Sequence, residues 1–298
     1  MSSLSKMFAL FQDPPPEFVF EIAADGIAMS RTRPPAAVQH ITLPPGVIAP
    51  SPVKENVLDP LAFEAAVRQL VPAGGKRGRR NAALILPDNS VRVAVLDFDA
   101  LPDKEEERRA LIGFRLRKSI PFDIDEAALS WFPQAGGKKV VVALAPAAAI
   151  AHYETAFRLA GLHPGLITVS SLAMLDLLPA KGSLMVARLG PGVLTVVGIS
   201  DGVVIIVRSL ELPELTSNPL DQIAEDIHPT LAYLEDQDGI RPEKLFLAGF
   251  GPESSHAATR LSVELDLPVD PLHEPYPGLS GYLASLAPSR APAKELAA

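Results

Sequence analysis

Residues 183–208 read SLMVARLGPGVLTVVGISDGVVIIVR, which predicts three strands joined by a glycine turn and an Asp-Gly turn. A glycine turn that follows a strand can bring backbone N–H groups up to phosphate oxygens, while an acidic residue two positions before the glycine holds a metal ion or its water. Arg188 occupies that position before Gly190. The stretch therefore predicts the shape of a nucleotide loop without its metal chemistry.

Composition limits the possible classes of protein. The chain has 298 residues, of which 48% are hydrophobic, and this is enough for two domains or for one elaborate domain with a real core. It contains no cysteine, which excludes disulfides and thiolate metal sites and fits a reducing compartment. Neither a secretory signal nor a stretch long enough for a transmembrane helix is recognisable, so we expect a soluble, cytoplasmic protein. The net charge of −8 argues against nucleic-acid binding.

Isolated polar and aromatic residues form no recognisable catalytic or metal motif. The basic run at residues 76–80 is interpreted as a solvated loop, since no aromatic residues accompany it for base stacking. Trp131 and Phe132 are interpreted as packing residues. No Ser-centred elbow, HExxH or Walker A pattern occurs. The histidines have no metal-ligand spacing; they are His40, His152, His163, His228, His256 and His273.

The first half of the chain predicts a hairpin, a helix and a small inserted module. Strands are expected at 18–22, 27–32 and 82–86, with Asp59 as the N-cap of a helix that starts at Pro60. A compact α/β module is expected over 91–164, with strands at 91–98, 127–132 and 139–145 and helices at 102–118 and 146–161. A strand at 166–169 and a short helix at 170–178 follow.

The second half begins with the three strands of 183–208. A helix is expected at 219–235, bent or broken at Pro229, then a buried strand at 245–248 that runs into Gly249-Phe250-Gly251. A helix at 253–264, an edge strand at 269–271 and a helix at 279–286 complete it. The predicted domains are 15–90 with 165–180, the inserted module 91–164, a second unit 181–286, and a disordered tail 287–298.

The order of these elements resembles the actin-like ATPase superfamily and, within it, the PilM-type proteins of type IV pilus assembly, with the cytoplasmic part of GspL as close kin. The segments that carry the resemblance are residues 86–91 (LPDNSV), 115–124 (RLRKSIPFDI), 153–164, 170–178 and 245–251, within a similarity that spans 18–286. The resemblance implies an α/β, actin-like (ribonuclease H-like) two-lobed fold with an inserted small α/β module.

The sequence departs from the nucleotide-binding members at each motif. Their first hairpin carries an Asp, a Gly and a Lys, and these align with Glu21, Ala23 and Ala28. The Asp of their second hairpin aligns with Arg188, and in the loop that follows Gly190 is retained. Their last pair of glycines aligns with Gly249 and Phe250, and Gly251 comes after them. A helical insertion before residue 219 is also missing. We expect a degenerate nucleotide cleft that does not take Mg²⁺-ATP in the usual mode.

Two of these residues allow more than one interpretation. Arg188 could bind an anion, including a phosphate without metal, or pair with a nearby carboxylate, and the pair is favoured. Glu21 could coordinate a metal ion, or have a core or ion-pair role, and the latter is favoured. The chain is therefore expected to be a pseudo-ATPase with no catalytic residues, no metal and no cofactor.

The resemblance implies a function in partner binding. We expect a non-catalytic scaffold of a type IV pilus or type II secretion-type platform, at the cytoplasmic face of the inner membrane. Its partner would be the cytoplasmic segment of a PilN-like or GspL/GspM-like membrane protein, with a motor ATPase as a further partner. The alternatives are an active actin-like ATPase or sugar-kinase-like enzyme, and an FtsA-like filament-forming protein, although residues 288–298 lack the expected amphipathic helix.

Overall fold

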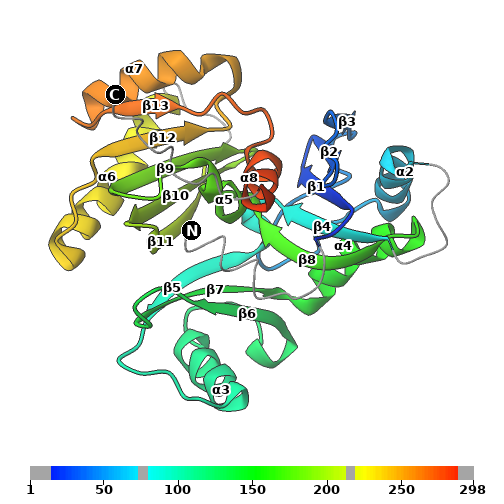
Figure 1. The fold of residues 1–298 in the computed structure, drawn as a ribbon, viewed down its shortest axis with the longest axis horizontal. Coiled ribbons are helices and arrows are strands. Elements are labelled where there is room, and N and C mark those ends of the chain that lie inside the picture. The colour runs from blue at the N-terminus through cyan, green and yellow to red at the C-terminus, as the bar shows by residue number, and fades with distance from the viewer. Residues whose placement is uncertain (1–14, 73–79, 213–218, 288–298) are drawn as a thin grey trace, which may run out of the picture.

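The computed structural model describes residues 15–72, 80–212 and 219–287 and contains three β-sheets. The first sheet has the order β3-β2-β1-β4-β8, the second β11-β10-β9-β12-β13 and the third β5-β7-β6. Figure 1 shows the first two sheets side by side, with the three-stranded sheet below them. The fold is therefore α/β with two large units and one small module, as the sequence predicts.

The first sheet forms from three antiparallel strands and two parallel strands. Its strands are β1 (Phe18–Ala23), β2 (Gly26–Arg31), β3 (Gln39–Thr42), β4 (Asn81–Leu86) and β8 (His163–Val169). The helices α2 (Pro60–Leu70) and α4 (Ala147–Leu159) pack together on this unit. Asp59 accepts a hydrogen bond from the amide of Ala62, so the predicted N-cap of α2 is confirmed.

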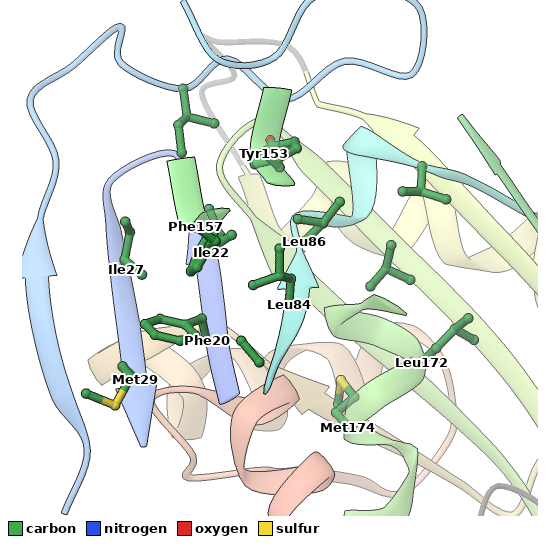
Figure 2. Close-up of a cluster of buried hydrophobic side chains, with 14 of the residues drawn as sticks. Phe20, Ile22, Ile27, Met29, Leu84, Leu86, Tyr153, Phe157, Leu172 and Met174 are labelled. Carbon is green, nitrogen blue, oxygen red and sulfur yellow. The ribbon is translucent and has the colours of Figure 1, made fainter. Parts of the chain in front are cut away.

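Alternation along β1 gives this sheet two different faces. Phe20 and Ile22 point to the side of α2 and α4, where Phe20 meets Phe157 in an edge-on ring contact of 4.9 Å between centroids. Figure 2 shows Phe157 and Tyr153 of α4 beside the side chains of this sheet. Val19 and Glu21 alternate with these residues and point to the opposite side. That second face carries the predicted nucleotide-cleft residue Glu21.

The second unit is a sheet with two helices. It contains β9 (Ser183–Gly190), β10 (Val193–Ser200), β11 (Val203–Glu211), β12 (Lys244–Ala248) and β13 (Val269–Pro271), with α6 (Pro219–Asp238) and α7 (Ser254–Glu264). The helix α6 continues through Pro229, so a break at this residue is wrong. Pro229 and Glu225, one turn earlier, are both exposed, so water can reach the carbonyl that lost its hydrogen bond.

The inserted module is smaller than its predicted range. Its sheet consists of β5 (Arg92–Asp97), β6 (Ala127–Pro133) and β7 (Lys139–Pro146), and α3 (Glu105–Leu116) packs on it through Ile112 and Leu116. The helix α4, expected in this module, instead buries Tyr153 and Phe157 in the core of the first unit. The periodicity of α4 predicts a helix correctly but does not show which sheet its apolar face covers.

Two further differences concern the first unit. The strand β3 was not predicted, because it has only four mostly exposed residues within a proline-rich stretch. The helix α8 (Pro277–Leu286), expected in the second unit, returns to pack on α5 (Ser170–Ala173) and β1 through Leu279. Figure 1 shows α8 in red beside α5, at the junction of the two large sheets.

Four short 3-10 helices complete the described chain: η1 (Asp88–Ser90), η2 (Ile124–Glu126), η3 (Met174–Leu177) and η4 (Gly251–Glu253). The apolar N-terminal cluster, most of the basic run at 76–80 and the tail from residue 288 lie outside the described residues.

Candidate functional site

The structure brings Glu21 and Arg188, two residues of the predicted nucleotide cleft, together where the two large units meet. Glu21 lies on β1 and Arg188 on β9, and Nη2 of Arg188 is 3.5 Å from Oε1 of Glu21. Both are nearly inaccessible to solvent, with exposed fractions of 8% for Arg188 and 5% for Glu21. The interpretation of Arg188 as a carboxylate partner agrees with this geometry.

A second carboxylate, which sequence reasoning missed, completes the contact. Nη1 of Arg188 is 3.1 Å from Oδ2 of Asp88, a residue only 2% exposed in η1, directly after β4. Its position in Leu86-Pro87-Asp88, at the carboxyl end of a buried strand, is a signal that was available in the sequence. One guanidinium thus lies between two buried carboxylates, and we call Glu21, Asp88 and Arg188 the cleft triad.

Backbone amides and a hydroxyl group donate further hydrogen bonds to the two carboxylates of the cleft triad. The amide of Leu279, in the first turn of α8, donates to Oε2 of Glu21 at 2.8 Å, and the Ser170 hydroxyl donates to Oε1. The amide of Ser171, in the first turn of α5, donates to Oδ1 of Asp88 at 2.8 Å. These donors offset the excess negative charge of two carboxylates around one cation.

Two of the three predicted glycines, Gly190 and Gly249, lie in close contact with neighbouring atoms. A Cβ added at Gly190 would lie 3.1 Å from Nη1 of Arg188, and one added at Gly249 would lie 2.1 Å from the carbonyl oxygen of Leu189. Gly249 also has a φ of +80°, in the left-handed region that favours glycine. Gly251 has a φ of +55° and open space around its Cβ position. Gly249 is therefore required for the close approach of β9 and β12, whatever the cleft binds.

The other two predicted positions lie next to Glu21 and make no contact with Arg188 that the described structure records. Ala28 lies opposite Glu21 in the hairpin register and packs in the same cluster as Leu279. Ala23 ends β1 and pairs with Gly26.

A divalent metal ion does not fit this arrangement of the cleft. Three of the four carboxylate oxygens of Glu21 and Asp88 accept N–H or O–H hydrogen bonds from neutral donors, and the guanidinium takes the space between the two carboxylates. A divalent ion at the same point would face the charge of Arg188 in a buried environment.

A separate groove lies between the inserted module and the first unit. Its cavity volume is about 630 Å³, and it is lined on one side by residues 127–132 of β6 and on the other by residues 165–169 of β8. Consecutive residues of both strands line it, rather than the alternate residues that one strand face presents. The groove therefore runs along strand edges, and we call it the edge groove.

Both strands of the edge groove are terminal strands of their sheets. In the described part of the chain, β6 pairs only with β7, and β8 pairs only with β4. Apolar side chains form its floor, among them Val141, Ala143 and Ile150. At the α3 side a second cavity of about 750 Å³ adjoins it, and Arg109 and Trp131 line both. The sequence predicts Trp131 as a packing residue alone. It does not show that Trp131 lines a groove, because the groove depends on the order of strands in the sheets.

The fold and the cleft define the class of structure. Two sheets, each made from three antiparallel strands with two parallel strands added beside them, meet where Arg188 contacts Glu21 and Asp88, and this is the actin-like ATPase fold. No protein-family model matches the chain, and no curated protein matches its sequence significantly.

Solved structures match the chain over most of its length. A PilM-PilN type IV pilus biogenesis complex matches with a TM-score of 0.76 at 19% identity, covering 93% of this chain and 100% of that chain. The cytoplasmic domain of EpsL, an inner membrane component of the type II secretion system of Vibrio cholerae, matches with a TM-score of 0.54 at 7% identity, covering 89% and 93%. A protein with an actin-like ATPase fold from Bacteroides thetaiotaomicron matches with a TM-score of 0.53 at 12% identity, covering 89% and 94%. The expected likeness to PilM and to a type II secretion cytoplasmic domain is confirmed as a likeness of fold.

Within residues 15–72, 80–212 and 219–287, every helix is too short or too polar to cross a lipid bilayer.

Proposed function

We propose that this protein is a non-catalytic, actin-like scaffold that binds an extended segment of a membrane protein in the edge groove. The observation that carries the proposal is the pair of unpartnered strand edges, β6 and β8, that face one apolar groove. An extended peptide can add to such an edge through main-chain hydrogen bonds, while its alternate side chains enter pockets on either side.

The module sheet would give an added strand two different surroundings. Side chains of β6 alternate between the α3 side, where Leu129 and Trp131 pack, and the side of the first unit, which Ala128 and Ser130 face. Lys104, Glu105 and Arg109 lie on the α3 side of the groove. A bound segment is therefore expected to alternate apolar residues with polar or charged ones.

The choice of partner rests on the structural neighbours. One neighbour is a PilM-PilN complex, and another is the cytoplasmic domain of an inner membrane component of a type II secretion system. We propose the corresponding partner here, a PilN-like or GspL/GspM-like protein with one membrane span, which would hold the chain at the cytoplasmic face of the inner membrane. Binding of a motor ATPase stays a prediction.

The proposed lack of catalysis rests on the cleft triad. Arg188 lies where a metal ion would be needed to balance the charge of a bound phosphate. Both neighbouring carboxylates, Glu21 and Asp88, are paired with Arg188. An Arg in this position supports the assignment as a pseudo-ATPase, which the Mg²⁺-ATP experiment in the Discussion tests.

Calorimetry with synthetic peptides tests the partner. The peptides carry the N-terminal cytoplasmic segments of single-span membrane proteins encoded beside this protein, and one of them should bind. Ala128→Arg, in an exposed position of β6 within the groove, should weaken that binding about tenfold or more. The same substitution at exposed Ala110 of α3, outside the groove, is the matched control and should have no effect. Absence of binding, or equal loss in both variants, would contradict the proposal.

A further inference from the structure

The cleft triad connects the two large units, here called the first and the second lobe, which share no strand pairing among the residues that the structure describes. Arg188 belongs to β9 of the second sheet, whereas Glu21, within β1, and Asp88, in η1 after β4, belong to the first unit. Without this contact, the guanidinium of the second lobe and the two carboxylates of the first lobe would each lack an oppositely charged partner. Such uncompensated burial is strongly unfavourable. The charges are therefore satisfied together only when the two lobes lie as they do here.

We propose that Arg188 is a built-in inter-lobe clamp, which holds the two lobes in one fixed arrangement without any bound ligand. In this role the guanidinium, which is part of the chain, takes the place of a bound metal cation between the lobes. It differs from a bound ion because it cannot dissociate, so the arrangement does not depend on the concentration of any ligand.

The first lobe prepares the two carboxylates for this contact. Glu21 is fixed by Leu279 of α8 and by Ser170 of α5, and Asp88 is fixed by the amide of Ser171. A Cβ added at Gly278 would lie 2.6 Å from the Ser170 hydroxyl oxygen and 3.0 Å from Oε1 of Glu21, so only glycine lets α8 approach this closely. The C-terminal helix thereby becomes part of the support on which the clamp closes.

Apolar contacts also join the lobes, but they have a different character. Val186 and Ala248 of the second sheet belong to the same buried cluster as Leu86 and Leu172 of the first unit. Gln134, which follows β6, pairs with both backbone groups of Val204 in β11 at 2.7 Å, and so joins the module to the second lobe. Apolar burial is non-directional and tolerates sliding, whereas the ion pairs fix the angle between the lobes. Loss of the clamp should loosen the interface without unfolding either lobe.

Hydrogen–deuterium exchange of the full chain tests the clamp. Arg188→Met keeps the length of the side chain and removes its charge, and it should speed exchange about tenfold or more on both sides of the cleft, at residues 21–23, 88–90 and 249–251. The matched control is Arg208→Met, since Arg208 bonds Thr230 within the second lobe only. The control should change exchange in the second lobe alone. Faster exchange confined to β9, or the same two-sided pattern in both variants, would overturn the proposal.

A variant without any buried charge keeps the test decisive if Arg188→Met fails to fold. The triple variant Glu21→Gln, Asp88→Asn and Arg188→Met retains the shape of the site but has no unpaired ion, so it should fold. It should still exchange faster than the native protein on both sides of the cleft, because neutral amides do not hold the lobes as the ion pairs do. Native exchange rates in this variant would show that the lobes need no clamp.

Discussion

Nη1 of Arg188 lies 3.1 Å from Oδ2 of Asp88, although 100 positions separate these residues in the chain. The contact joins the last part of β9 to the segment that follows β4, and both residues are more than nine-tenths buried. Because a buried ion pair must offset the loss of hydration of both groups, its net contribution to stability is small, but removal of one partner is costly. The stability of the protein should therefore fall when one charged partner is removed, and should change less when all the charged partners are replaced together.

Asp88→Asn should lower the free energy of unfolding by about 3 kcal/mol, because it leaves Arg188 with one buried carboxylate partner. The triple variant Glu21→Gln, Asp88→Asn and Arg188→Met, which leaves no buried ion without its partner, should recover a large part of this loss. Chemical denaturation of the two variants and the native protein measures both effects. Asp125→Asn is the control, since Asp125 pairs with Arg117 on the surface, and it should change stability by less than about 0.5 kcal/mol. Equal effects of Asp88→Asn and Asp125→Asn would contradict the buried pair.

The sequence showed most of the fold because its signals are local. The hairpin of β1 and β2, the capped start of α2 and the strand runs of β9 to β11 each depend on neighbouring residues. The sequence also indicated that Arg188 stands where nucleotide-binding proteins of this fold have an acidic residue. It did not show that Asp88 is its partner or that β6 and β8 face one groove, because both facts depend on which sheets the strands join. The helices α4 and α8 were placed in the wrong units for the same reason.

Mg²⁺-ATP should produce no saturable heat in calorimetry and no rise in the melting temperature of the native protein. The reason is that Arg188 already pairs with both Glu21 and Asp88 and repels a divalent ion. Saturable, Mg²⁺-dependent binding would contradict this and would favour the alternative of an active ATPase or a sugar-kinase-like enzyme.

A matched variant shows whether Arg188 itself is responsible. Arg188→Asp brings three carboxylates to one buried point, so the variant should be unstable alone and should be stabilised by Mg²⁺ added without nucleotide. Thermal denaturation across a range of Mg²⁺ concentrations measures this. The absence of any Mg²⁺-dependent rise in the melting temperature of a folded variant would show that the carboxylates are too far apart or too firmly bonded to bind an ion.

Gly278→Ala should destabilise the protein by about 2 kcal/mol or more, because the added methyl group meets the Ser170 hydroxyl at 2.6 Å and Glu21 at 3.0 Å. The control is Gly165→Ala in β8, where an added Cβ meets no atom within 4 Å. Chemical denaturation should separate the two variants clearly. Similar stability of both would indicate that α8 moves away from the first sheet at little cost.

Stability at high pH should depend on Tyr153, a buried residue of α4 whose hydroxyl contacts η1. Its hydroxyl is 3.1 Å from the Ser90 hydroxyl and 3.3 Å from Oδ1 of Asn56. Burial raises the pKa of Tyr153 to about 12, and the hydrogen bond with Ser90 opposes this rise. In the unfolded chain a tyrosine ionises near pH 10. The stabilising contribution of the raised pKa is therefore complete below pH 10 and is lost as the pH rises from about 10 to about 12.

The expected slope follows from proton linkage. Between about pH 10 and 12 the unfolded state loses the Tyr153 proton while the folded state keeps it, so the free energy of unfolding falls by up to about 1.4 kcal/mol per pH unit. Tyr153→Phe removes this contribution of Tyr153. The contributions of other titrating groups cancel when the free energy of unfolding of the variant is subtracted from that of the native protein. Denaturation at intervals from pH 9 to 12 measures the difference. Tyr233→Phe, at a position 44% exposed, should run parallel to the native curve. If the Tyr153→Phe curve also runs parallel, the hydroxyl is reached by solvent before the protein unfolds, and α4 does not seal the core of the first unit.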